Sequence, residues 1–149
     1  MLQSLHIENV AVVKRLDIEF SAGMTALTGE TGAGKSIIID SLLLLCGAKN
    51  GRELIRTGAE KASVSAIFSV NENVQNKLSE LGYDADENGE IQISRQINSD
   101  GRSSARVNRR VVPVSVLREI TPALMGIQTQ SERSAFADKS TYAGMLDAF

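Results

Sequence analysis

Eight residues near the amino terminus have the types and the spacing that suit the phosphates of a nucleotide. The segment reads GETGAGKS and fits the phosphate-loop pattern GxxxxGK[ST]. Its glycines allow a tight curl in which successive backbone N–H groups point at phosphate oxygens. Lys35 would place a compact positive charge beside the β- and γ-phosphates, and the Ser36 hydroxyl is a suitable Mg²⁺ ligand. The predicted site for nucleotide and Mg²⁺ comprises Gly29, Glu30, Thr31, Gly32, Ala33, Gly34, Lys35 and Ser36.

The elements on either side should position this loop. Residues 24–28 predict a buried strand, and residues 36–46 predict a helix that is apolar almost all round and ends at Gly47. The positive end of that helix would face the phosphates. The alternative is an ordinary glycine-rich turn with an exposed lysine. Asp40, four residues after Ser36, either supports the magnesium shell or is a structural polar group near the helix start.

Hydrolysis needs more than a phosphate loop. Proteins of this class also hold Mg²⁺ with an aspartate from a separate strand and position the attacking water with another residue. The apolar run that ends at Asp40 belongs to the predicted helix, and the run that ends at Asp147 is short and reads as helix. Either the catalytic strand lies on sequence outside this chain, which stops within a predicted helix, or the protein binds nucleotide without turning it over.

The remaining pattern predicts an α/β fold. Strands are expected at 2–13, 16–20, 63–70 and 91–97, a strand or hairpin at 103–112, and a short strand at 123–127. Helices are expected at 74–82 and from Pro113 onward.

Length and composition restrict the class of protein. A chain of 149 residues is long enough for one core of ordinary size. Its single cysteine, Cys46, excludes an internal disulfide and a zinc site made of cysteines. No apolar stretch reaches the roughly 20 residues that span a bilayer, and the amino terminus lacks the layout of a signal peptide. We expect a soluble, cytoplasmic protein without a membrane partner.

The net charge of −2 is small, but charge is unevenly distributed. Residues 72–90 carry six acidic residues and one lysine, whereas residues 95–118 carry six arginines and one aspartate. Arginines suit phosphate contacts, so Arg102, Arg106, Arg109 and Arg110 could meet DNA directly. The alternative is a solvated hairpin face that pairs with the acidic segment.

Several segments together resemble the RecN family of DNA repair proteins, which are bacterial relatives of the SMC proteins. The first is LHIENVAVVKRLDIEFSAGMTALTGETGAGKSIIIDSL. The others are ELIRTGAEKASVSAIF, GRSSARVNRRVVPVSVLREI and IQTQSE, so the resemblance covers almost the whole chain. The phosphate loop is common to all P-loop NTPases. Its combination with LIRTGAEKA is typical of a much smaller group of proteins.

The resemblance implies a P-loop NTPase fold, namely an ABC/SMC-type head lobe with a mixed sheet around the P-loop helix. In that family the head forms from both chain ends, and two heads enclose two ATP molecules with Mg²⁺. Residues 1–149 would be the amino-terminal part of a head, with a coiled coil starting at about 131–149. Gln130 would be the glutamine-loop residue that reaches Mg²⁺ and the attacking water, and Arg56 would lie near the nucleotide. The partners implied are the carboxy-terminal half of the same head, a second head in an ATP-dependent dimer, and DNA.

The sequence departs from the family pattern in two places. Gln128 and Thr129 stand where the family has histidine and glycine, and Asn108-Arg109 stands where it has Asn-Gly. Asn-Gly favours a tight turn with positive φ, so Arg109 leaves the turn type open.

The motif and the resemblance lead to three alternative functions, of which the resemblance implies the first. The first is an ATPase half-site in DNA double-strand break repair and recombination at the nucleoid, inactive alone because the magnesium aspartate and the catalytic glutamate are absent. The second is a stand-alone nucleotide-binding module or switch without hydrolysis. The third is a small P-loop kinase.

Overall fold

Six strands form one sheet in the computed structural model, which describes residues 1–28, 32–49 and 51–127. The strands occur in the spatial order β2-β1-β3-β4-β5-β6, and every pairing between them is antiparallel. They span β1 (Leu2–Val10), β2 (Val13–Glu19), β3 (Lys61–Ser69), β4 (Glu90–Asn98), β5 (Ser103–Val107) and β6 (Arg110–Val112). The helices are α1 (Gly32–Leu45), the 3-10 turn η1 (Arg52–Leu54), α2 (Glu72–Glu80) and α3 (Val114–Leu124).

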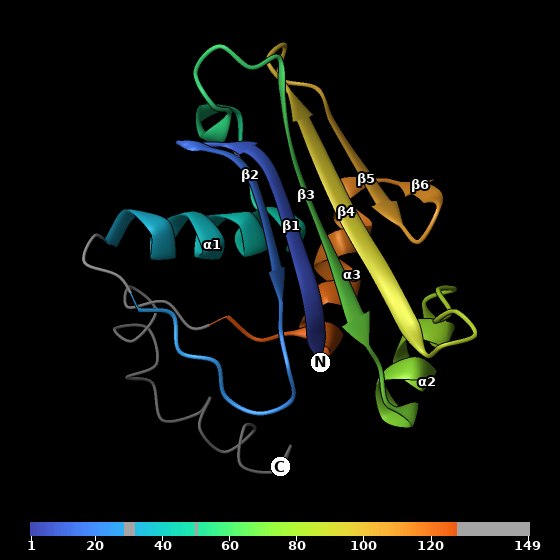
Figure 1. The fold of residues 1–149 in the computed structure, drawn as a ribbon. Coiled ribbons are helices and arrows are strands. Elements are labelled where there is room, and N and C mark those ends of the chain that lie inside the picture. Colours follow the sequence, from blue (N-terminus) through green and yellow to red (C-terminus); the bar gives the residue numbers. More distant parts are fainter. Residues whose placement is uncertain (29–31, 50, 128–149) are drawn as a thin grey trace, which may run out of the picture.

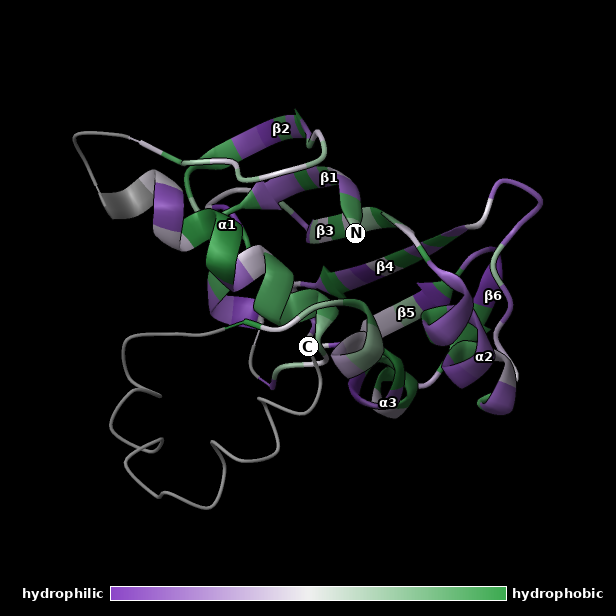
Figure 2. Ribbon diagram, turned by 90° about the horizontal axis from the view of Figure 1, so that it is seen from below, coloured by the Kyte–Doolittle hydropathy of each residue, from purple (hydrophilic) through white to green (hydrophobic). Residues whose placement is uncertain are grey.

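The helices α1 and α3 pack on one face of this sheet (Figure 1). Alternate residues of each strand face them, so β3 contributes Ala62, Val64, Ala66 and Phe68 to the core. Figure 2 shows the strand layer and the helix layer edge-on, with α2 beside α3. The strand period of two therefore produces a single apolar layer between sheet and helices.

The opposite face of the sheet is polar. Ser63 and Ser65 on β3 lie beside Gln96 and Ser94 on β4, and Ser94 lies beside Arg106 on β5. No helix covers this face in the described residues (Figure 2). The alternation of polar and apolar residues predicted half-buried strands, and this prediction is confirmed for β3 and β4.

Two predicted strands are not formed. Residues 24–28 and 125–127 have no regular structure, and Met24 is 97% exposed. A strand exists only when a neighbour accepts and donates its ladder hydrogen bonds, and no described strand lies beside residues 24–28. The described sheet is accordingly antiparallel, and the parallel strand that a mixed sheet needs is not among the described residues.

Helix α1 is buried on one side only, whereas its composition predicts burial on most sides. Ile37, Ile38 and Leu45 face the core, and Ile39 on the other side is 37% exposed. Leu42 and Leu43 beside it are half-buried. This apolar outer side of α1 is available for further packing.

The end of α1 follows the sequence prediction. Gly47 has φ +79°, the amide of Gly47 donates to Leu44 O at 3.0 Å, and the amide of Ala48 donates to Leu43 O at 3.1 Å. This pattern is the Schellman motif, in which a glycine in the left-handed region closes the helix. Helix α3 begins at Val114, one residue later than predicted, because Pro113 is its N-cap residue with extended backbone.

Candidate nucleotide site

Helix α1 begins inside the GETGAGKS segment, so the second half of the motif is helical. Gly34, Lys35 and Ser36 are exposed in the first turns of the helix, and the backbone of Ala33 is helical. Gly29, Glu30 and Thr31 lie outside the described residues. The helical start agrees with the sequence, because the long apolar run that follows favours a buried helix.

The first turn of α1 suits an anion. The first backbone N–H groups of a helix have no partner within the helix, and the helix dipole adds positive potential there. No acidic residue lies in this first turn. A Cβ added at Gly34 would meet no described atom within 4 Å, so the surface beside this glycine is open.

The oxygen donors for Mg²⁺ at this site are few. Ser36 supplies a hydroxyl in the first turns of α1, and Asp40 is half-buried one helical turn further on. No group of three or more His, Cys, Asp or Glu side chains within the described ranges could hold a metal ion. Mg²⁺ bound through phosphates, waters and one or two protein oxygens does not need such a group. Whether Asp40 supports the magnesium shell or is structural stays open.

Arg56 lies between η1 and β3 and is half-buried. Its backbone amide donates to Asn9 O at 2.9 Å, and the neighbouring Ile55 bridges to Val10. Asn9 near the end of β1 and Ala11 in the turn after it have positive φ, and the amide of Ala11 donates to Leu54 O. This loop is thus fixed to the end of β1, and the role of the Arg56 side chain stays a prediction.

Gln130 and the departures at Gln128 and Thr129 lie outside the described residues, as does the predicted start of a coiled coil at 131–149. Helix α3 ends at Leu124, six residues before Gln130 in the sequence. The glutamine segment therefore follows α3 closely along the chain.

The sequence analysis did not assign a role to two arginines that bind the carboxyl end of α1. Arg95 is 7% exposed, and its Nη1 donates to Leu44 O at 2.9 Å and to Ala48 O at 2.7 Å. Arg118 on α3 donates from Nε to Gly47 O at 2.9 Å. The sequence does indicate that Arg95 is buried. The alternation in IQISRQI places Arg95 on the same face of the strand as Ile91, Ile93 and Ile97.

The arginine-rich hairpin of β5 and β6 turns at Asn108 and Arg109. Asn108 has φ +53°, whereas Arg109 is not in the left-handed region. Only the first central residue has positive φ, as in a type II′ turn, so the type I′ geometry that Asn-Gly favours is absent. The side chain of Asn108 accepts from the amide of Gln92 and donates to Asp84 O, each at 2.9 Å.

The arginines of this hairpin, together with Arg102 in the turn just before it, are called the hairpin arginines, and they do not face the same way. Arg109 and Arg110 line one pocket of about 330 Å³ together with Asp84. Arg106 instead lines a polar pocket of about 360 Å³ on the outer face, with Ser65 and Ser94. In the described part of the chain, the one ion pair of a hairpin arginine is that of Arg102 with Asp100, at 3.5 Å. Asp84 of the acidic segment thus lies near Arg109 and Arg110, but no ion pair joins the acidic segment to these arginines in the described residues.

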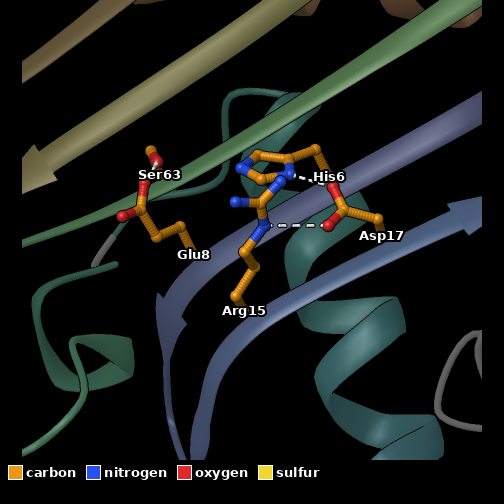
Figure 3. Close-up of polar contacts among 5 residues, drawn as sticks. All are labelled: His6, Glu8, Arg15, Asp17 and Ser63. Carbon is orange, nitrogen blue, oxygen red and sulfur yellow. Dashed lines mark hydrogen bonds and ion pairs between the residues drawn. The ribbon is translucent and has the colours of Figure 1, made fainter.

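A second charged group lies on the outer face at the β1–β2 end of the sheet (Figure 3). His6 Nδ1 donates to the carboxylate of Asp17, and Arg15 Nε donates to the same carboxylate at 2.9 Å. The hydrogen bond from His6, and then that from Arg15, holds the pKa of Asp17 below its ordinary value of 3.8. A depressed carboxyl pKa adds stability above that ordinary value, and this stability is lost as the pH falls through the lower folded-state pKa.

No helix in the described ranges is both long and apolar enough to cross a membrane. A free thiol, Cys46, is half-buried after α1. Burial raises the pKa of this thiol, so it is a poor nucleophile at neutral pH.

Comparison with known proteins agrees with the fold. A family model described as "AAA domain" matches residues 4–141. DNA repair protein RecN of Halalkalibacterium halodurans is 37% identical to this chain over 151 residues, which are 100% of this chain and 26% of that protein. RecN of Haemophilus influenzae is 39% identical over 152 residues, 27% of its length. The chain thus spans about a quarter of the length of the curated relatives it matches.

Solved structures of SMC heads have the same fold. One, from work on the ATP-driven dimerisation and DNA-stimulated activation of SMC ATPases, is 28% identical with a TM-score of 0.71, and the match covers 97% of this chain and 95% of that chain. The predicted P-loop NTPase fold of the SMC-head type is confirmed by this likeness, and the predicted relationship to RecN is confirmed by the sequence matches. The chain belongs to the AAA domain family and is a homologue of RecN DNA repair proteins.

Proposed function

We propose that this chain binds ATP with Mg²⁺ as one part of an ATPase head in DNA repair. The observation that carries the proposal is the start of α1 within GETGAGKS, with Lys35 and Ser36 exposed in its first turns. Gly29 to Ser36 would cradle the phosphates, Ser36 and Gln130 would hold Mg²⁺, and Arg56 would lie near the nucleotide. The relatives are described as DNA repair proteins and SMC ATPases, which supports an ATPase over a small kinase.

The chain would work as the amino-terminal part of a longer protein. Residues 1–149 would form one side of the head, and a coiled coil would begin at about 131–149. The carboxy-terminal half would supply the missing magnesium aspartate and catalytic glutamate, and a second head would close over the nucleotide. One of the similar structures is described as undergoing ATP-driven dimerisation, which supports this assembly. A cytoplasmic, nucleoid-associated location follows from the proposed role in recombination.

Equilibrium binding of a fluorescent ATP analogue tests the ATP proposal. We expect saturable binding to the 149-residue chain in the presence of Mg²⁺ and weaker binding in excess EDTA, because the ion bridges the phosphates and the Ser36 hydroxyl. Ser36→Ala should lose most of this Mg²⁺ dependence. Ser41→Ala is its matched control, because the buried Ser41 hydroxyl donates to Ile37 O within the same helix and faces the core. Binding that is equally strong with and without Mg²⁺ would contradict the assignment of Ser36.

We further propose that DNA contacts the outer face of the sheet through the hairpin arginines. Arg102 has a side chain that is 87% exposed, and Arg106 lies beside the serines of β3 and β4. Arg109 and Arg110 lie nearer the acidic turn, so they are weaker candidates than the first two. Contacts of this kind bind phosphates without reading the base sequence.

The salt dependence of DNA binding measures how many phosphates these arginines neutralise. Replacing Arg102 and Arg106 with alanine should reduce the slope of log affinity against log salt by about 1 for each phosphate that the variant no longer neutralises. Lys77→Ala on α2, within the acidic segment, should leave the slope unchanged. An unchanged slope in the double variant would favour a solvated hairpin face instead.

A further inference from the structure

The carboxyl end of α1 is held by two arginines from different elements. The last turn of a helix leaves carbonyl groups without partners inside the helix, and the helix dipole gives this end a negative potential. Here Leu44 O, Gly47 O and Ala48 O each accept a hydrogen bond from a guanidinium. We define this pair of side chains, Arg95 from β4 and Arg118 from α3, as the arginine clamp.

The guanidinium of Arg95 makes three hydrogen bonds. Its Nη1 binds two carbonyls, and its Nε donates to Ser103 Oγ at 3.1 Å. Burial lowers the pKa of the Arg95 guanidinium, and the nearby Arg118 lowers it further. No carboxylate pairs with it in the described part of the chain, so carbonyl dipoles and the negative end of α1 balance its charge.

Arg118 is the exposed half of the clamp. Its stem lies against Gly47, because a Cβ added to this glycine would be 2.7 Å from Arg118 Cγ. Its guanidinium joins the loop after α1 to α3. Helix α3 leads within six residues to Gln130, while α1 starts at the phosphate loop. The two helices that border the proposed site in sequence are therefore tied together at Gly47.

We propose that the arginine clamp positions the phosphate loop from the far end of α1 and couples it to α3. Helix α1 has 14 residues and is about 21 Å long at 1.5 Å per residue. A rigid helix pinned at one end turns a small rotation there into a displacement of its other end, where the phosphates would bind. Displacements of about 1 Å at a binding site can reduce activity about 100-fold. The inference about ATP rests on the proposed function, whereas the inference about the helix does not.

Substitutions of Arg118 test the clamp in the 149-residue chain, since this side chain is exposed and its removal leaves the core intact. Arg118→Met keeps the stem and removes the donors, and Arg118→Lys restores a positive charge. Glu119→Gln changes the next residue on α3, which is also exposed, and is the matched control. Two measurements are made on each variant: amide hydrogen exchange without nucleotide, and the Kd for the Mg²⁺ complex of a fluorescent ATP analogue.

In Arg118→Met, amide exchange in residues 34–38 should rise about three- to tenfold, with exchange in β1 unchanged. The Kd should rise by a similar factor, about three- to tenfold, and Arg118→Lys should recover most of both changes. Glu119→Gln should behave as the parent chain.

A purely local role would give a different result. If exchange in Arg118→Met changes only at residues 44–48 and in α3, the clamp merely caps the helix and the proposal is overturned. A Kd that stays within about twofold of the parent value overturns the coupling to the phosphate loop. If the parent chain binds no ATP, the proposed function fails, and the exchange measurement still decides whether the two ends of α1 are coupled.

Discussion

Replacing Lys35 with alanine is expected to weaken ATP binding by about 10- to 100-fold. A hydrogen bond to a charged group contributes roughly 1.5–3 kcal/mol, and each 1.4 kcal/mol is about a tenfold change in Kd. Lys35 is exposed in the first turn of α1, where its ammonium can reach the β- and γ-phosphates. Isothermal titration of the parent and variant chains with ATP and Mg²⁺ measures the change.

The fold should not depend on this lysine, because its side chain lies outside the core. The urea midpoints of the two chains are therefore expected to agree. Lys49→Ala is a suitable control, because Lys49 is an exposed lysine beyond the opposite end of the same helix. If Lys35→Ala and Lys49→Ala bind ATP equally well, the phosphate-loop assignment is incorrect.

The second large effect is on turnover. The 149-residue chain alone is expected to bind ATP and to hydrolyse almost none. Adding the carboxy-terminal part of a RecN-type head should raise turnover about 100-fold or more, which is the contribution of one missing general base. The reason is chemical, since none of the strands in the described residues ends in an aspartate that could bind the metal.

Packing gives a second reason for this expectation. The outer side of α1 exposes Ile39, and the segment before the phosphate loop exposes Met24 and Leu27, which are 97% and 40% exposed. Exposed apolar side chains favour contact with another surface. Ile39 follows Ser36 by three residues on the same helix, so a piece that covers this side of α1 would also approach the proposed site.

Steady-state phosphate release, with and without the added piece, measures this effect. A chain carrying Lys35→Ala, mixed with the same carboxy-terminal piece, should remain inactive, which excludes contaminating ATPases. Appreciable turnover by the chain alone would contradict the half-site and favour a complete small enzyme. No turnover in either case, with ATP binding intact, would favour a nucleotide-binding switch.

Several local elements could be predicted from the sequence alone. The alternation of apolar residues defined β3 and β4, and the glycine at position 47 and the proline at position 113 marked the end of α1 and the start of α3. These features follow from steric limits on the backbone and from the two periodicities of secondary structure. The phosphate-loop motif is equally local, because its chemistry depends on residue types in eight consecutive positions.

Contacts between segments that are far apart in the sequence could be identified only from the tertiary structure. Residues 24–28 have strand composition and yet form no strand, because pairing depends on a neighbour that composition does not supply. The pattern placed Arg95 on an apolar face, but only the fold showed that the carbonyls of residues 44 and 48 satisfy its charge. The bond from Arg118 to Gly47 joins residues 71 positions apart. Partners at that separation are set by how strands and helices pack, and local sequence does not encode which carbonyl an arginine will reach.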